Sequence, residues 1–241
     1  MTADGLLNDF AIRSFRDVAD GDYIVARMAY RSGLAAQCLW ASQQAIEKYL
    51  KCILFLNRIP AREVKHDLGA AMSRIENSGK VGPDLTKLTQ DFIRHLDTYG
   101  RFRYLETSYY LWAWHLPALD RAVWEVRRYC TLSDGPRNVK LQGGLSPNKV
   151  RLPCGYLEKI IDDAKSPARG PLLWQNAFFG KRARKKVAAG GSFHATNSPL
   201  SLHPEIVDEV LRYTYLPKGM KEAYRALLAE RASGHAAGEP T

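Results

Sequence analysis

The residue with the clearest capacity for proton transfer is His66, which stands between Lys65 and Asp67 at the start of a predicted helix. An imidazole can give or accept a proton near neutral pH, so it could act as a general acid or base in a ligand or catalytic cleft. A histidine at a helix start can also serve only as a cap or pack into the core. The sequence leaves both interpretations of His66 open.

Arginines are interleaved with aromatic rings over residues 99–114. Such a segment can stack bases on its rings and hold phosphates with its guanidinium groups. Tyr and Trp are also favoured at interfaces, so the segment could instead anchor onto the protein itself or onto a dimer partner. We take Arg101, Arg103 and Tyr104 as the candidate nucleic-acid-binding residues of this segment.

The strongest local concentration of positive charge is a basic run formed by Lys181, Arg182, Arg184, Lys185 and Lys186. The formal net charge of +10 is uneven, because residues 1–132 contain 18 Lys and Arg against 15 Asp and Glu, whereas the remaining residues contain 17 against 10. A basic excess favours polyanions such as nucleic acid. A solvated loop that serves only solubility is the alternative interpretation of the run.

Several classes of site lack their sequence motif. The chain has no GxxxxGK[ST], GxGxxG, HExxH or GxSxG pattern. Its four cysteines are scattered without a CxxC pair, which indicates buried thiols rather than zinc ligands. We therefore expect no metal and no cofactor. The N-terminus lacks a signal-peptide pattern and no apolar run reaches the ~20 residues of a membrane span, so we expect a cytoplasmic protein.

The elements that must position these residues are predicted to be helices. The longest covers residues 36–57, where Ile46 and Leu50 share an apolar face, and Gln43, Glu47 and Lys51 follow at i, i+4 on a neighbouring stripe. An earlier helix is predicted over residues 12–31. The side chains expected to face inward from it are Phe15, Val18, Val25, Met28 and Ala29.

Further helices are predicted from about Asp67, whose carboxylate can cap the first turn, from about Pro83, and after Pro117. These lengths indicate an all-α antiparallel bundle of four to five helices, with no strand in residues 1–132. Residues 133–153 are rich in Gly, Pro, Ser and Asn and are predicted to be a linker. Residues 154–241 are predicted to form a basic, partly helical extension with a disordered tail.

Four short motifs in a fixed order, spread over residues 12–131, resemble the HEPN domain family. They are a leading helix with Asp22, Tyr23, Ala26 and Gly33; the group Gln43, Gln44, Glu47, Lys48 and Lys51; the element Lys65, His66, Asp67 and Leu68; and the segment from Tyr99 to Tyr104. The resemblance implies a HEPN-like helical bundle from a prokaryotic system that handles nucleic acid or nucleotides, commonly paired as a homodimer.

Members of this family that cut RNA carry an Arg followed after four to six residues by a His, near the start of the last bundle helix. This chain lacks that spacing, so its sequence does not support a ribonuclease of this kind. We therefore favour a non-enzymatic module that binds RNA, DNA, a nucleotide or a protein partner, such as a nucleotidyltransferase or an antitoxin, in a defence or toxin–antitoxin-type system. A diverged ribonuclease using His66 and Arg103, and a structural dimerisation scaffold, are the alternatives.

Overall fold

The computed structural model describes residues 3–100, 109–131, 155–180, 193–195, 204–211 and 219–236. Its bundle helices are α1 (Ala3–Ala11), the π-helical turn η1 (Ile12–Arg16), α2 (Asp17–Arg31), α3 (Ala35–Leu56), α4 (Leu68–Asn77), α5 (Lys87–Tyr99) and α6 (His115–Arg127). The other elements are α7 (Tyr156–Asp162), α8 (Arg169–Leu173), η2 (Pro204–Ile206), α10 (Val207–Val210), α11 (Met220–Ala236) and the strands β1 (Tyr109–Leu111) and β2 (Phe193–Ala195). The predicted all-α class is confirmed.

The chain divides into two compact units. The first comprises Met1–Arg101 and Leu111–Ser192, and the second comprises Phe102–Tyr110 and Phe193–Thr241. In the second unit, Val207 and Tyr224 form a small buried cluster, against which Leu211, Leu227 and Leu228 pack. The predicted division at residues 133–153 stays a prediction, since those residues lie outside the described part of the chain.

The expectation that residues 1–132 contain no strand is wrong at Tyr109–Leu111, which pairs with Phe193–Ala195 as a two-stranded sheet. Both segments contain aromatic residues, which suit extended backbone. Because the partner strand lies more than 80 residues further along the chain, no periodicity within residues 1–132 could have indicated the pairing.

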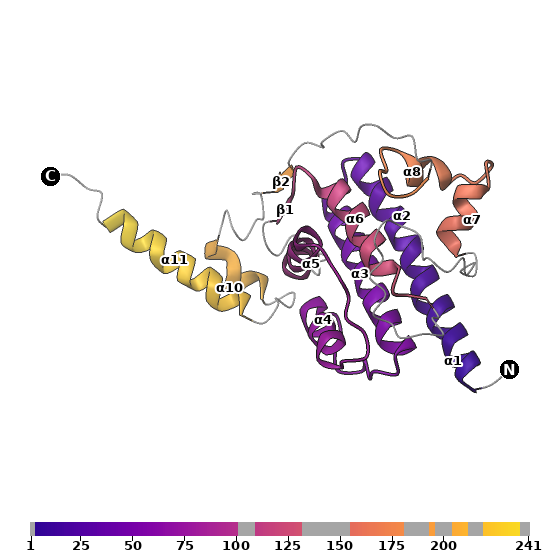
Figure 1. The fold of residues 1–241 in the computed structure, drawn as a ribbon. Helices are drawn as coiled ribbons and strands as arrows, with labels where there is room; N and C mark the ends of the chain where they lie inside the picture. Colours follow the sequence, from indigo (N-terminus) through magenta and orange to yellow (C-terminus); the bar gives the residue numbers. More distant parts are fainter. Residues whose placement is uncertain are drawn as a thin grey trace. The chain divides into compact units, whose positions relative to one another are not determined.

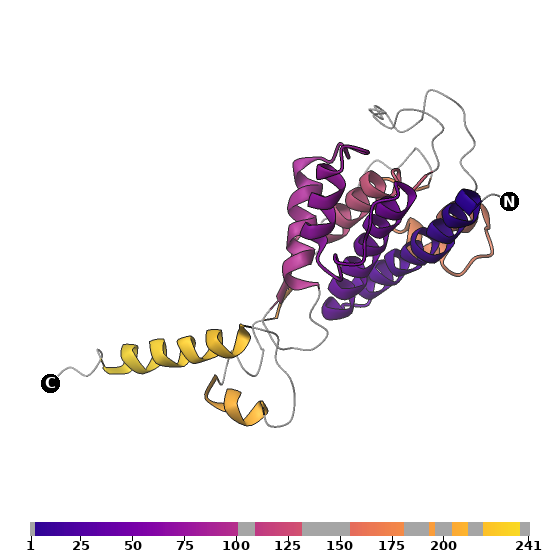
Figure 2. The same ribbon diagram turned by 90° about the horizontal axis from the view of Figure 1, so that it is seen from below.

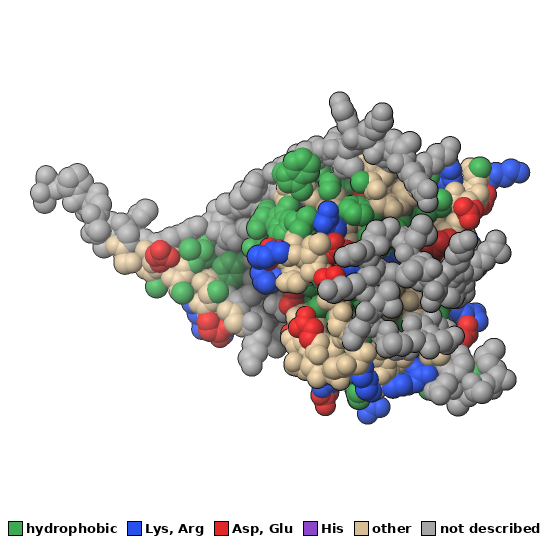
Figure 3. Space-filling model, in the orientation of Figure 1, with side chains coloured by type: hydrophobic (Ala, Val, Ile, Leu, Met, Phe, Trp, Pro, Cys, Tyr) green, Lys and Arg blue, Asp and Glu red, His purple; other side chains and the backbone are tan. Residues whose placement is uncertain are grey.

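Helix α3 is the centre of the bundle. It packs against α2, α4, α5 and α6, and it contributes more buried residues than any other described helix. Figure 1 shows α2, α3 and α6 side by side, and Figure 2 shows α2 and α3 running alongside each other. On the face drawn in Figure 3, acidic and basic side chains are interspersed over the described bundle. No described helix is long and apolar enough to cross a membrane.

Local signals set the ends of two bundle helices. The carboxylate of Asp67 accepts a hydrogen bond from the backbone N–H of Ala70 at 2.6 Å, so the predicted cap of α4 is confirmed. Helix α5 ends where Gly100 lies against α3. A Cβ atom at Gly100 would stand 2.5 Å from Cβ of Gln43 and 2.8 Å from the carbonyl oxygen of Leu96, so only glycine permits this close approach.

The inward face predicted for the first helix is wrong for three of its residues. Val18, Val25 and Met28 are 45–50% exposed, whereas the charged Asp20 and Arg27 on another face are buried. Helical periodicity alone favours burial of the apolar face. In this helix the buried face combines Ala19, Tyr23 and Ala26 with Asp20 and Arg27, and the two charges are buried because they meet oppositely charged partners on α6.

Those partners form two reciprocal pairs between α2 and α6. Arg127 donates from Nε to Oδ1 of Asp20 at 2.7 Å and from Nη2 to Oδ2 at 2.8 Å, while Arg27 donates to Asp120. In each helix the acid precedes the arginine by seven residues, so the two pairs require antiparallel helices. Tyr49 donates to Asp20 at 2.6 Å. Each buried charge is therefore paired and hydrogen-bonded, as buried ions need to be.

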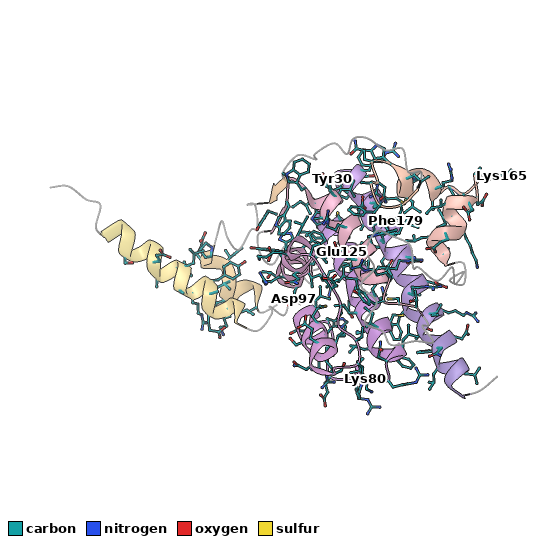
Figure 4. All side chains as sticks on the ribbon, in the orientation of Figure 1. Tyr30, Lys80, Asp97, Glu125, Lys165 and Phe179 are labelled. Atoms are coloured by element: carbon teal, nitrogen blue, oxygen red, sulfur yellow. The ribbon has the colours of Figure 1, made fainter. Side chains whose placement is uncertain are left out.

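Residues 155–180 pack onto the bundle at these ion pairs. Arg127 reaches Glu158 of α7 at 2.7 Å, and Nε of Arg27 donates to the carbonyl of Pro171 at 3.0 Å. Asn176 donates to the hydroxyl of Tyr23 at 2.8 Å. The ring of Phe179, labelled in Figure 4, lies 5.7 Å from the ring of Tyr23. This segment is thus part of the same packed unit as α2 and α6.

Candidate functional site

A polar stripe on α3 builds one side of the candidate site. Lys51 Nζ lies 2.6 Å from Oε1 of Glu47, which is the i, i+4 ion pair that the sequence predicts. Gln43 donates from Nε2 to Oε2 of Glu47 at 3.0 Å, and Gln44 donates to Oε1 of Gln43 at 2.7 Å. The Glu47 side chain is only 5% exposed, so its carboxylate is fixed by these donors.

The loop between α3 and α4 supplies the histidine. Nδ1 of His66 lies 3.1 Å from both carboxylate oxygens of Glu47, while 68% of the His66 side chain is exposed. The preceding residue, Lys65, has a φ of +49°, which lies in the left-handed region that non-glycine residues rarely adopt. Backbone strain of this kind persists where the surrounding structure holds it, commonly at functional sites.

The Glu47 carboxyl is held ionised. Burial acts to raise its pKa, but hydrogen bonds from Lys51, His66 and Gln43 outweigh burial, and the pKa is lowered overall. An ionised, buried carboxylate fixes the orientation of an imidazole through Nδ1 and leaves Nε2 to act on a ligand. The Glu47–His66 pair therefore has the form of an oriented acid–base group.

An open groove of about 970 Å³ is lined by Lys51, which pairs with Glu47, and by Lys65, which precedes His66, although Glu47 and His66 themselves do not line it. Four basic residues line the groove, Lys51, Arg62, Lys65 and Arg74, together with the acidic Glu63. The remaining lining residues are Phe15, Phe55, Pro60 and Ala61. Arg74 pairs with Glu63 at 2.8 Å. Arg62 and Lys65 are exposed and make no ion pair with another described residue. The lining carries more positive than negative side chains, which favours anions electrostatically.

The rings form the apolar part of the groove. Phe15 comes from η1 and Phe55 from α3, with ring centroids 6.0 Å apart, and both are half-buried. The π-helical turn inserts extra backbone into the α1–α2 rod at Phe15, and such turns occur frequently at functional sites. The Phe10 ring packs against Phe15 and Phe55, at 5.9 and 5.4 Å. A partly exposed phenyl ring next to cations can receive a planar base while the cations hold phosphates.

Residues 12–126 match the HEPN domain family model, a span that contains the whole groove and the Glu47–His66 pair. Residues 12–126 of this chain therefore form a HEPN domain. No curated protein and no solved structure matches the chain. HEPN domains have roles in nucleic-acid binding or RNA cleavage, so the charge and the rings of the groove agree with the general role of the family.

The HEPN signature residues are largely brought together. Gln43, Gln44, Glu47, Lys51 and His66 form one hydrogen-bonded cluster. Lys48 points elsewhere and pairs with Asp22 of α2, so its role is to join two helices.

The other predicted site residues lie outside the described part of the chain. These are Arg101, Arg103, Tyr104, Lys181, Arg182, Arg184, Lys185 and Lys186.

The groove residues that sequence reasoning missed include Arg62, Arg74, Phe15 and Phe55. One available signal was the concentration of Arg58, Arg62 and Lys65 within eight residues around Pro60. The contributions of Phe15 and Arg74 had no sequence signal, because they come from elements that meet the loop only in the folded bundle.

Two other histidines of the HEPN domain are core residues. Burial lowers the pKa of His95 to about 4, and burial together with the nearby His95 lowers the pKa of His115 to about 3. Both rings lie in an aromatic cluster, where His115 is 5.0 Å from the ring of Phe92. Buried rings of this kind cannot reach a polymeric substrate.

The described residues contain no group of three or more His, Cys, Asp or Glu side chains arranged to hold a metal ion. Cys38, Cys52 and Cys130 are buried free thiols, as the sequence predicts, and Cys154 lies outside the described residues.

Proposed function

We propose that this HEPN chain is a nucleic-acid-binding module and that the groove of Lys51, Arg62, Lys65, Phe15 and Phe55 contacts the ligand. The observation that carries the proposal is the combination of four basic side chains, one acidic side chain and two partly buried rings in one open groove. Cations displace counterions condensed on a phosphate backbone, and rings stack on unpaired bases. An open groove also admits a polymer, which an enclosed cavity would exclude.

Arg62→Ala combined with Lys65→Ala is expected to weaken binding of a labelled single-stranded oligonucleotide roughly tenfold at low salt. The slope of log affinity against log salt should flatten by about 1 to 2, since each lost phosphate contact removes ~0.7 to 1 from the slope. Phe55→Leu should weaken binding with little change of slope, because stacking releases few counterions. Fluorescence anisotropy titrations at several salt concentrations measure both quantities.

The matched control removes two cations from α5, where Lys87 and Arg94 both pair with the exposed Asp91. Lys87→Ala with Arg94→Ala changes net charge equally but leaves the groove intact. Equal losses in the control and in the groove variant would contradict the groove assignment. A parallel variant that neutralises Lys181, Arg182, Arg184, Lys185 and Lys186 tests the basic run, and unchanged affinity and slope would make that run a solvated loop.

A second candidate function, RNA cleavage, is favoured by the Glu47–His66 geometry. With Nδ1 held 3.1 Å from the Glu47 carboxylate, Nε2 of His66 is available to accept the proton of a ribose 2′-hydroxyl. The 2′ oxygen then attacks phosphorus, and the 5′ oxygen leaves with a proton from solvent. The products are a 2′,3′-cyclic phosphate and a 5′-hydroxyl. Lys65, which precedes His66 in the chain and lines the groove, would hold the phosphate.

If the chain cleaves RNA, His66→Ala is expected to lower the rate about 10²- to 10⁴-fold while leaving RNA affinity within about twofold of wild type. Glu47→Gln should lower the rate as well, since the amide no longer orients the imidazole as a carboxylate does. Gel analysis of labelled RNA, with a 2′-deoxy-substituted strand as the uncleavable control, measures the rate. Equal cleavage by wild type and His66→Ala would leave the binding module as the function.

A further inference from the structure

The groove contains one acidic residue, Glu63, among its basic ones. Nη2 of Arg74 donates a hydrogen bond to Oε2 of Glu63 at 2.8 Å, and Nη1 of the same guanidinium donates to the carbonyl oxygen of Pro60 at 2.8 Å. Arg74 belongs to α4, whereas Glu63 and Pro60 belong to the loop between α3 and α4. One arginine therefore holds both a carboxylate and the backbone of the loop that lines the groove.

The two contacts of Arg74 differ in how easily a ligand can replace them. The Glu63 side chain is 80% exposed and the Arg74 side chain is 34% exposed. An ion pair between exposed side chains changes an equilibrium constant by at most about fivefold, because water and salt screen it. A guanidinium carries several N–H donors, so Nη2 can take a new acceptor while Nη1 keeps the carbonyl of Pro60. The contact with Glu63 is thus the replaceable one.

The loop backbone is fixed by contacts that do not involve the Glu63 side chain. Val64 is 3% exposed, and its N–H donates to the carbonyl of Ala61 at 3.2 Å. The N–H of Asp67 donates to the carbonyl of Val64 at 3.1 Å. The bond from Arg74 to the loop carbonyl adds a further anchor. Releasing the carboxylate from Arg74 therefore changes the charge of the groove and leaves its shape.

We propose that Glu63 competes with the ligand for Arg74, and that a phosphate of the bound nucleic acid takes the place of the Glu63 carboxylate. This inference rests on the function proposed above. Phosphate oxygens accept from a guanidinium as carboxylate oxygens do, and a cation that binds a nucleic-acid backbone also releases condensed counterions. In the free protein the carboxylate neutralises one basic side chain of the groove, so Glu63 sets how tightly the groove holds a polyanion.

Glu63→Gln is expected to tighten binding of a labelled single-stranded oligonucleotide about three- to fivefold at low salt, because Arg74 no longer has to leave a carboxylate. Glu76→Gln is the charge-matched control. Glu76 is exposed on α4, two residues after Arg74, and does not line the groove. Its replacement changes the net charge equally and should tighten binding by less than about twofold, because salt screens a charge outside the groove. Fluorescence anisotropy titrations measure both affinities.

A double-mutant cycle distinguishes exchange from repulsion alone. Arg74→Gln removes the cation for which Glu63 competes. If the exchange occurs, Arg74→Gln should weaken binding, and adding Glu63→Gln in that background should then restore less than about twofold. Repulsion alone between Glu63 and the ligand predicts a gain of full size or larger, because the carboxylate has lost its neutralising partner. Circular dichroism checks that each variant keeps its helical content.

The outcomes separate this exchange from the binding function on which it rests. A gain from Glu63→Gln that exceeds the gain from Glu76→Gln and requires Arg74 supports the exchange. If Glu63→Gln binds no more tightly than Glu76→Gln, or gains fully without Arg74, the exchange is overturned and the groove remains the binding site. If neither the wild type nor Glu63→Gln binds the oligonucleotide, the proposed function is overturned, and the exchange with it.

Discussion

Replacing Arg127 with Met is expected to lower the free energy of unfolding by about 3–5 kcal/mol, because it leaves the buried Asp20 carboxylate without its counter-ion. Asp20 is completely buried and accepts two hydrogen bonds from the Arg127 guanidinium. Among the described residues, the hydroxyl of Tyr49 and the more distant backbone N–H of Leu157, at 3.3 Å, are the donors that would remain. Urea denaturation followed by circular dichroism measures the loss.

Glu158 provides the control for this experiment. It accepts hydrogen bonds from the outer side of the same guanidinium, at 2.7 and 2.8 Å, but its side chain is 43% exposed. Glu158→Gln should therefore cost at most about 1 kcal/mol. Adding Asp20→Asn to Arg127→Met should recover part of the stability, because the stranded charge is removed. Equal losses in Arg127→Met and Glu158→Gln would contradict the assigned role of the buried pair.

Between pH 7 and pH 5, the free energy of unfolding is expected to fall by about 2 kcal/mol for each of His95 and His115. In the unfolded chain both imidazoles take up protons near pH 6.5. In the folded chain, burial holds the pKa of His95 at about 4 and that of His115 at about 3, so both stay neutral. The unfolded state thus binds more protons below pH 6.5, and stability is lost as the pH falls toward the folded pKa values.

The pH range over which stability is lost distinguishes the effect of these histidines from that of the carboxylates. Glu47 and Glu158 have lowered folded pKa values, so their contributions are present above the usual pKa of 4.5 and are lost only below it. His95→Gln and His115→Gln should each flatten the decline between pH 7 and pH 5, whatever they cost at pH 7. Urea midpoints at half-unit pH steps measure the slope. A stability that is constant over this window would contradict the burial of neutral imidazoles.

The sequence by itself determined the features that depend on neighbours along the chain. The apolar period of α3 predicted Ile46 and Leu50 in the core, and both are completely buried. The spacing of Glu47 and Lys51 predicted their ion pair, and Asp67 predicted the start of α4. These interactions join residues within one or two helical turns, so the local pattern contains all the necessary information.

Tertiary structure decided the features whose partners lie far away in the sequence. Burial of Asp20 and Arg27 on α2 depends on Arg127 and Asp120, about 100 residues later in the chain, so periodicity alone chose the wrong inward residues. The groove likewise combines Phe15 of η1 with Arg74 of α4 and the loop between α3 and α4. For α2, the free energy of pairing buried charges outweighs the local preference for burying its apolar residues. For the groove, the residues come together only because distant elements pack in the folded chain.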